Sequence, residues 1–175
     1  MVSQELRDGV QKLVEKLSSL DDPANPPKPT TVVVTMTGPQ TSEAKCDKFS
    51  VVSDEPTSVG GTDTAPPPSS IFVASIGFAE NVIFARQAAL QDIDFDALET
   101  KVEAQWDRRG MFGIRDADPS ISNVMIETRI ATGASPEKIA ELVRLTHKRC
   151  PMTATVAKAA TIRRRLFVNG LETPV

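Results

Sequence analysis

Residues 48–81 read KFSVVSDEPTSVGGTDTAPPPSSIFVASIGFAEN, and this stretch holds three kinds of local structure in order. It starts inside a β-branched segment that predicts a strand over residues 45–53. Residues 54–70 are rich in Gly, Pro, Ser and Thr and predict a long loop, a feature that in compact domains is often functional. Residues 71–90 predict a helix whose first half is apolar almost all round, so it is expected to be a buried central helix.

Further strands and a helix surround this stretch. Alternating or β-branched residues predict strands over residues 31–37, 98–106, 121–132 and 161–168, the first forming a hairpin with residues 45–53. Ser135 and Pro136 provide the N-cap and the first position of another helix, with Ile139, Leu142, Val143 and Thr146 facing inward. The resulting order, α, ββ, α, ββ, α, β, predicts an α+β domain with a mainly antiparallel sheet and a buried central helix.

The N-terminal segment reads as a separate element. Ser3 is the expected N-cap of an amphipathic helix that runs to residue 20, and four prolines make residues 21–30 a stiff linker. We therefore divide the chain into residues 1–30, helix and linker, and residues 31–175, the main domain. A helix this short does not bury its apolar stripe alone, so it is expected to dock on the main domain or on a second subunit.

Composition excludes several classes of function. The 175 residues carry a net charge of -3, with a pI near 5.3, which argues against nucleic acid or an anionic membrane as a partner. No signal peptide and no membrane-spanning run is expected, so the predicted location is cytoplasmic. Two cysteines and one histidine are too few for a disulfide framework or, without carboxylates, a structural zinc site, and no metal is expected.

Cys150, followed by Pro151, is the strongest candidate for a reactive side chain. Pro151 suits the first turn of a short helix through Lys158, which places Cys150 at the N-cap. A thiol there is stabilised as thiolate by the helix dipole, and Lys148 and Arg149 add to that effect. The alternative is a buried, inert cysteine that ends the preceding helix.

Other polar features leave alternatives open. The glycines of residues 60–68 either present backbone N–H groups to an anion or belong to a rigid lead-in to the central helix. In the run 163–165 we expect a solvated strand with one paired arginine, not a nucleic-acid patch. His147 is either a surface residue or a partner for Cys150, and Glu80 is either a site residue or the start of a solvent-exposed face.

The stretch at residues 48–81, followed downstream by HKRCPM, resembles the OsmC/Ohr family, the osmotically inducible and organic hydroperoxide resistance proteins. The resemblance covers about residues 31–168. It implies an OsmC-like α+β fold that forms an intertwined homodimer with active sites at the subunit interface. It also implies reduction of hydroperoxides by two cysteines, one in the central helix and one in a later Cys-Pro.

The resemblance assigns the site residues one by one. Cys150 matches the Cys-Pro cysteine, whereas the cysteine of the central helix falls on Ala79, whose methyl group cannot attack an O–O bond. The activating glutamate falls on Ser70, and Lys45 lies near a basic position of related sequences. With Phe78 and Glu80, these residues are the expected lining of an apolar interface pocket.

Two functions follow from this resemblance. One is a cytoplasmic homodimer linked to hydroperoxide stress that binds an apolar small molecule or hydroperoxide, or senses oxidants, through the remaining thiol of Cys150. The other is an enzyme, an organic hydroperoxide reductase that uses Cys150 alone. Neither function requires a cofactor, and whether the protein is an enzyme stays open at this point.

Overall fold

The computed structural model describes residues 1–19, 29–159 and 162–174. It divides into two compact units, one made of residues 1–19 and 75–175 and the other of residues 20–74. Residues 20–28, which include most of the linker predicted over residues 21–30, lie outside the described residues.

The first unit is built on a four-stranded sheet of order β4-β5-β6-β7. Its strands are β4 (Ala97–Gln105), β5 (Ser122–Ala131), β6 (Ile162–Val168) and β7 (Leu171–Thr173). Neighbouring strands are antiparallel except β5 and β6, which pair in parallel through the crossover made by α4 (Pro136–Arg149) and α5 (Pro151–Val156). The predicted α+β class with a mainly antiparallel sheet is confirmed; β7 and a short helix, α3 (Arg108–Met111), were not predicted.

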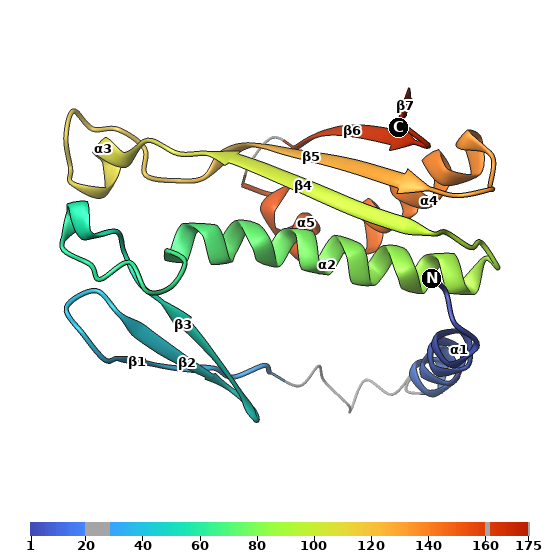
Figure 1. Cartoon of the computed structure of the whole chain (residues 1–175), viewed down its shortest axis with the longest axis horizontal. Coiled ribbons are helices and arrows are strands. Elements are labelled where there is room, and N and C mark those ends of the chain that lie inside the picture. Colours follow the sequence, from blue (N-terminus) through green and yellow to red (C-terminus); the bar gives the residue numbers. More distant parts are fainter. Residues whose placement is uncertain (20–28, 160–161, 175) are drawn as a thin grey trace. The chain divides into compact units, whose positions relative to one another are not determined.

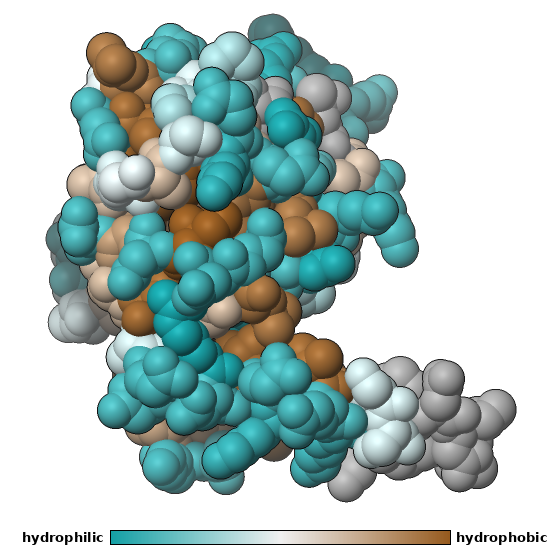
Figure 2. Space-filling model, turned by 90° about the vertical axis from the view of Figure 1, so that its right-hand side faces the viewer, coloured by the Kyte–Doolittle hydropathy of each residue, from teal (hydrophilic) through white to brown (hydrophobic). Residues whose placement is uncertain are grey.

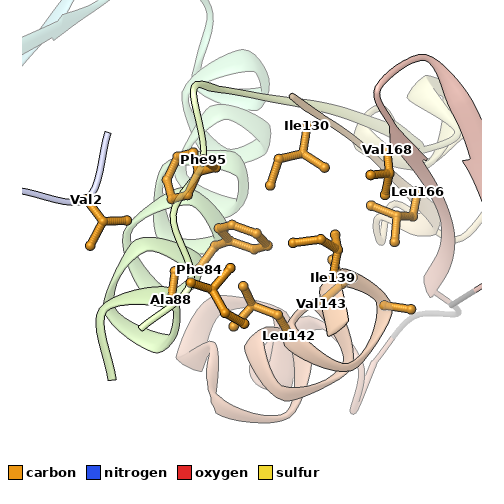
Figure 3. Close-up of a cluster of buried hydrophobic side chains, with 12 residues drawn as sticks. Val2, Phe84, Ala88, Phe95, Ile130, Ile139, Leu142, Val143, Leu166 and Val168 are labelled. Atoms are coloured by element: carbon orange, nitrogen blue, oxygen red, sulfur yellow. The ribbon is translucent and has the colours of Figure 1, made fainter. Parts of the chain in front are cut away.

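Helices α2 (Pro68–Leu90), α4 and α5 lie along the sheet (Figure 1). One hydrophobic cluster joins α2, α4, β5 and β6 and includes Phe84, Ile130, Leu142 and Leu166 (Figure 3). A second cluster forms around Ile76 of α2, with Val124 and Ile126 of β5. Alternation places these β5 side chains on the helix-facing side of the sheet, as the sequence pattern predicts.

Helix α2 is the central helix of the fold as predicted, but within this chain only part of its surface is buried. Its buried residues are Ile76, Glu80, Phe84, Gln87 and Ala88, whereas Phe72, Phe78 and Val82 are exposed. Apolar residues therefore lie both on the buried side of α2 and on its exposed side. Among the described helices, α2 alone is long and apolar enough to cross a membrane by length and composition, a test that core helices of soluble proteins also pass.

Helix α1 (Gln4–Ser18) docks on the first unit through its first half. The hydroxyl of Ser3 accepts a hydrogen bond from the N–H of Leu6, which confirms the predicted cap, and Val10 is buried. Arg7 forms an ion pair with Asp92. Leu13 and Leu17 stay exposed, and Figure 2 shows polar side chains over most of this end of the molecule with apolar ones between them.

The second unit holds a three-stranded antiparallel sheet of β1 (Val33–Met36), β2 (Ser42–Cys46) and β3 (Phe49–Ser53). The single strand predicted over residues 45–53 is wrong, because Asp47 takes a left-handed conformation with φ 54° and turns the chain back on itself. Cys46 therefore ends β2 and pairs with Phe49 in the hairpin.

A buried carboxylate organises the long loop that follows β3. Asp54 accepts six hydrogen bonds, from the hydroxyl of Thr41, the N–H of Glu55, and both the N–H and the hydroxyl of Thr62 and of Thr64. The hydroxyl of Thr62 contributes most to holding the pKa of Asp54 far below its ordinary value. These N–H groups point at a carboxylate of the same loop, which favours the rigid lead-in over an anion site.

Candidate functional site

A buried ion pair occupies the centre of the first unit. Glu80 extends from α2 and Arg164 from β6, with their side chains only 5% and 11% exposed. The guanidinium donates from Nη1 to Oε2 at 3.0 Å and from Nη2 to Oε1 at 3.1 Å, a two-pronged contact of the kind arginine forms best with carboxylates. The run 163–165 was predicted to hold one paired arginine, but it holds two: Arg164 pairs with Glu80, and Arg165 pairs with two exposed-side carboxylates, Glu127 and Glu172. Glu80 is buried, so it does not start a solvent-exposed face.

The pair also reaches both helices of the crossover. The Nη2 of Arg164 donates to Nδ1 of His147 in α4, and the hydroxyl of Thr153 in α5 donates to Oε1 of Glu80. Because a guanidinium only donates, Nδ1 is an acceptor and His147 is neutral with its proton on Nε2. Four elements, α2, β6, α4 and α5, therefore meet at one carboxylate and one guanidinium.

The electrostatics of His147 agree with this arrangement. Burial lowers the pKa of His147 below its ordinary value, the charge of Arg164 lowers it further, and Glu80 partly opposes both. Since the pKa is lower in the folded chain than in the unfolded one, the contribution of His147 to folding stability is present above about pH 6.5 and falls as the pH drops toward the folded-state value. With Nδ1 occupied by Arg164, His147 has no free lone pair with which to take a proton from a thiol.

Cys150 lies at the junction of the two crossover helices. It is the C-cap of α4 and the N-cap of α5, with Pro151 at the first helical position, as predicted. Its N–H donates to the carbonyl of Thr146 at 2.8 Å and its carbonyl accepts from the N–H of Ala154 at 2.9 Å. The side chain has no exposed surface and, within the described chain, makes no capping hydrogen bond to α5.

The residues three positions before and after Cys150 connect it to the Glu80–Arg164 ion pair. His147 precedes the cysteine by three residues and Thr153 follows it by three, so Arg164 and Glu80 hold the chain on both sides of the thiol. The charged neighbours Lys148 and Arg149 are exposed, and Arg149 donates to Oε1 of Gln87 on α2.

The predicted site residues are divided between the two units. Ala79 is half-buried and Phe78 is 70% exposed, both on α2 beside Glu80. Ser70 and Lys45 belong to the second unit, where Ser70 is exposed and the ammonium of Lys45 donates to Glu43.

The sequence did not predict the roles of two residues in the network around Glu80, Arg164 and Thr153. One arginine of the run 163–165 was expected to be paired, but nothing local identified Arg164 or its partner Glu80, which is 84 residues away. Nothing in the sequence pointed to Thr153, because a threonine in a short helix is common. Its role follows only from the hydrogen bond that its hydroxyl donates to the buried carboxylate of Glu80.

The first unit offers little internal space at this point. A gap beside Glu80 is too narrow for a water molecule; it is lined by Glu80, Phe84, Leu98, Thr100, Thr128, Val143 and Thr146. In the described part of the chain, no group of three or more His, Cys, Asp or Glu side chains is arranged to hold a metal ion.

Comparison with known families places the chain. The family model described as OsmC-like protein matches residues 61–164, more than half of the sequence. The chain belongs to the OsmC-like family. Members of this family are soluble proteins, which agrees with a buried ion pair at the middle of α2. No curated protein matches the sequence.

Solved structures of OsmC-like proteins share the fold. An OsmC-like protein of Mycoplasma pneumoniae is 16% identical with a TM-score of 0.71, covering 81% of this chain and 97% of that one. An organic hydroperoxide resistance protein OsmC of Legionella pneumophila, also described as a predicted redox protein, is 17% identical with a TM-score of 0.64, covering 81% of this chain and 100% of that one. An organic hydroperoxide resistance protein of Elizabethkingia anophelis is 16% identical with a TM-score of 0.64, covering 81% of this chain and 99% of that one.

These comparisons confirm the family resemblance and the OsmC-like fold expected from residues 48–81 and the downstream Cys-Pro. Two of the solved structures that share this fold are named organic hydroperoxide resistance proteins.

Proposed function

We propose that this OsmC-like protein senses organic hydroperoxides through Cys150, without a two-cysteine peroxidase cycle. The observation that supports this most directly is the pair of positions 79 and 150: an alanine stands at one and a thiol is kept at the other, beside the buried Glu80–Arg164 pair. The thiolate attacks the O–O bond, one oxygen stays on sulfur as a sulfenic acid, and the organic fragment leaves as an alkoxide that takes a proton from water to become an alcohol. With Ala79 in place of a thiol, no disulfide forms between positions 79 and 150 to complete a cycle.

The test uses Cys46→Ser, in which Cys150 is the only thiol, and Cys46→Ser/Cys150→Ser as the control. After brief treatment with cumene hydroperoxide, a sulfenic-acid probe and peptide mass analysis are expected to find one oxygen on Cys150. Hydroperoxide consumption should stop once that thiol is used. An unmodified Cys150 contradicts the proposal, whereas sustained turnover with a dithiol, absent from the control, favours the one-cysteine reductase instead.

The proposed assembly is a homodimer in which a second copy covers the apolar side of α2. Phe78 and Val82, one helical turn apart, are 70% and 48% exposed, and isolated soluble chains rarely leave such a stripe uncovered. An interface there also adds the apolar surroundings that a small hydroperoxide needs beside Ala79.

Sedimentation equilibrium is expected to give twice the chain mass of 18.9 kDa. Phe78→Asp should shift the protein to monomer, because it places a charge at the centre of an apolar interface. Phe112→Asp is the matched control, since Phe112 is similarly exposed but lies after α3. A monomeric unsubstituted protein, or an unchanged mass for Phe78→Asp, argues against this interface.

The proposal needs no cofactor and places the protein in the cytoplasm. Both Cys46 and Cys150 are free thiols in the structure, the form that a reducing compartment maintains. Sensing by sulfenic acid also requires such a compartment, because a cellular thiol must return the oxidised cysteine to its reduced form.

A further inference from the structure

Cys150 poses a problem of access. Its side chain is fully buried, so neither a hydroperoxide nor any other reagent reaches the sulfur unless some part of the chain moves. The segment that begins at Cys150 is α5, a helix of six residues between Pro151 and Val156.

Helix α5 turns one side of its described residues toward the rest of its unit. Pro151, Met152, Ala154 and Thr155 are exposed, and only Thr153 and Val156 face inward. Val156 packs at the edge of the cluster around Ile76. The hydroxyl of Thr153 donates a hydrogen bond from α5 to the carboxylate of Glu80 on α2.

Glu80 is a well-fixed acceptor for that hydroxyl. The two-pronged contact from Arg164 on β6 sets the orientation of the carboxylate, and Arg164 is in turn held by His147. The acceptor therefore stays in place whether α5 is docked or not, because it depends on α2, β6 and α4 alone.

We infer that α5 is a lid over Cys150, held shut by the hydrogen bond from Thr153 to Glu80, so that opening of α5 sets the rate at which an oxidant reaches the thiol. Thr153 and Glu80 are then positioning residues for the sensing reaction, and in that respect the inference rests on the proposed function. Reaction requires the open state, so the observed rate is the product of the opening equilibrium and the reactivity of the exposed thiol.

The test measures alkylation of Cys150 by N-ethylmaleimide in the Cys46→Ser protein. Thr153→Val keeps the shape of the side chain and removes only the hydroxyl, and it is expected to raise the alkylation rate about tenfold, the effect of one buried hydrogen bond. Thr155→Val is the matched control: its hydroxyl donates to the carbonyl of Pro151 within α5, is exposed, and does not reach Glu80. Its rate should stay within about twofold of the parent.

Amide hydrogen exchange identifies the segment that opens. In Thr153→Val the N–H groups of Ala154 and Ala157, which donate to Cys150 and Thr153, should exchange faster. The N–H of Cys150, which donates to Thr146 in α4, should keep its protection. If Thr153→Val fails to fold, Val156→Ala replaces it, since it weakens the same attachment through the apolar contact and should also speed alkylation.

An unchanged alkylation rate in Thr153→Val overturns the lid, and so does an equal acceleration in Thr155→Val or equal loss of protection in α4. The maleimide does not depend on hydroperoxide chemistry. Faster alkylation together with a Cys150 that cumene hydroperoxide never oxidises would therefore keep the lid and refute the proposed sensing function.

Discussion

Arg164→Met is expected to lower the free energy of unfolding by about 3–5 kcal/mol, because it leaves the carboxylate of Glu80 buried without its counter-charge. Urea unfolding measures the change. In the double variant Glu80→Gln/Arg164→Met most of the loss should be recovered, since no charge stays buried, while Gln still accepts from Thr153.

Arg144→Met is the control for arginine removal as such. Arg144 pairs with Glu141 on the exposed side of α4, where both side chains are more than half exposed, and its loss should cost less than about 1 kcal/mol. Nuclear magnetic resonance of the single histidine gives a second readout: Arg164→Met should raise the pKa of His147, since it removes the repulsion and leaves Glu80. A cost equal to that of Arg144→Met, or an unmoved histidine, contradicts the described network.

Asp54→Asn is the second substitution with a large expected effect. Oδ2 of Asp54 accepts four hydrogen bonds from Thr62 and Thr64, so an amide nitrogen at that place would meet donors only, and turning the amide over loses the acceptor facing Thr41 and Glu55. The melting temperature should fall by roughly 10 °C, as expected for several lost hydrogen bonds to a charge. Calorimetry or circular dichroism measures it.

Asp63→Asn is the matched control in the same loop. Asp63 is exposed and has φ 56°, a conformation that asparagine adopts readily. The melting temperature of the Asp63→Asn protein should therefore hardly differ from that of the parent. Because the pKa of Asp54 lies below its unfolded value of about 3.9, its contribution is complete above that pH and is lost as the pH falls further. The difference in melting temperature between Asp54→Asn and the parent protein should therefore become smaller below about pH 4. A difference that stays constant with pH would contradict the charged state of Asp54.

Features that depend on neighbouring residues could be predicted from the sequence. Ser3 and the pair Ser135-Pro136 cap their helices as expected, since an N-cap is decided within one turn. The inward residues of α4 and the N-cap place of Cys150 follow from the same local rules.

Features that depend on distant partners could not. Whether Glu80 is buried depends on Arg164 from β6, and the apolar sequence of α2 does not say which side of the helix meets the sheet. The turn at Asp47 was missed for another reason: the residues around it alternate like a strand, and a single left-handed residue reverses the chain without a glycine. The site shows the same division, because Cys150 was predicted and the hydroxyl of Thr153 was not.

Strand β1 has a consequence for the handling of this protein. It is an edge of the three-stranded sheet, and its residues Val33, Val34, Thr35 and Met36 carry no charge and are all exposed. Proteins commonly protect such edges with lysines, prolines or bulges, because an open strand is a template for strands of other molecules. Strands of other molecules can therefore pair with the open edge of β1 during synthesis or storage. Such pairing favours aggregation even where the rest of the fold is intact.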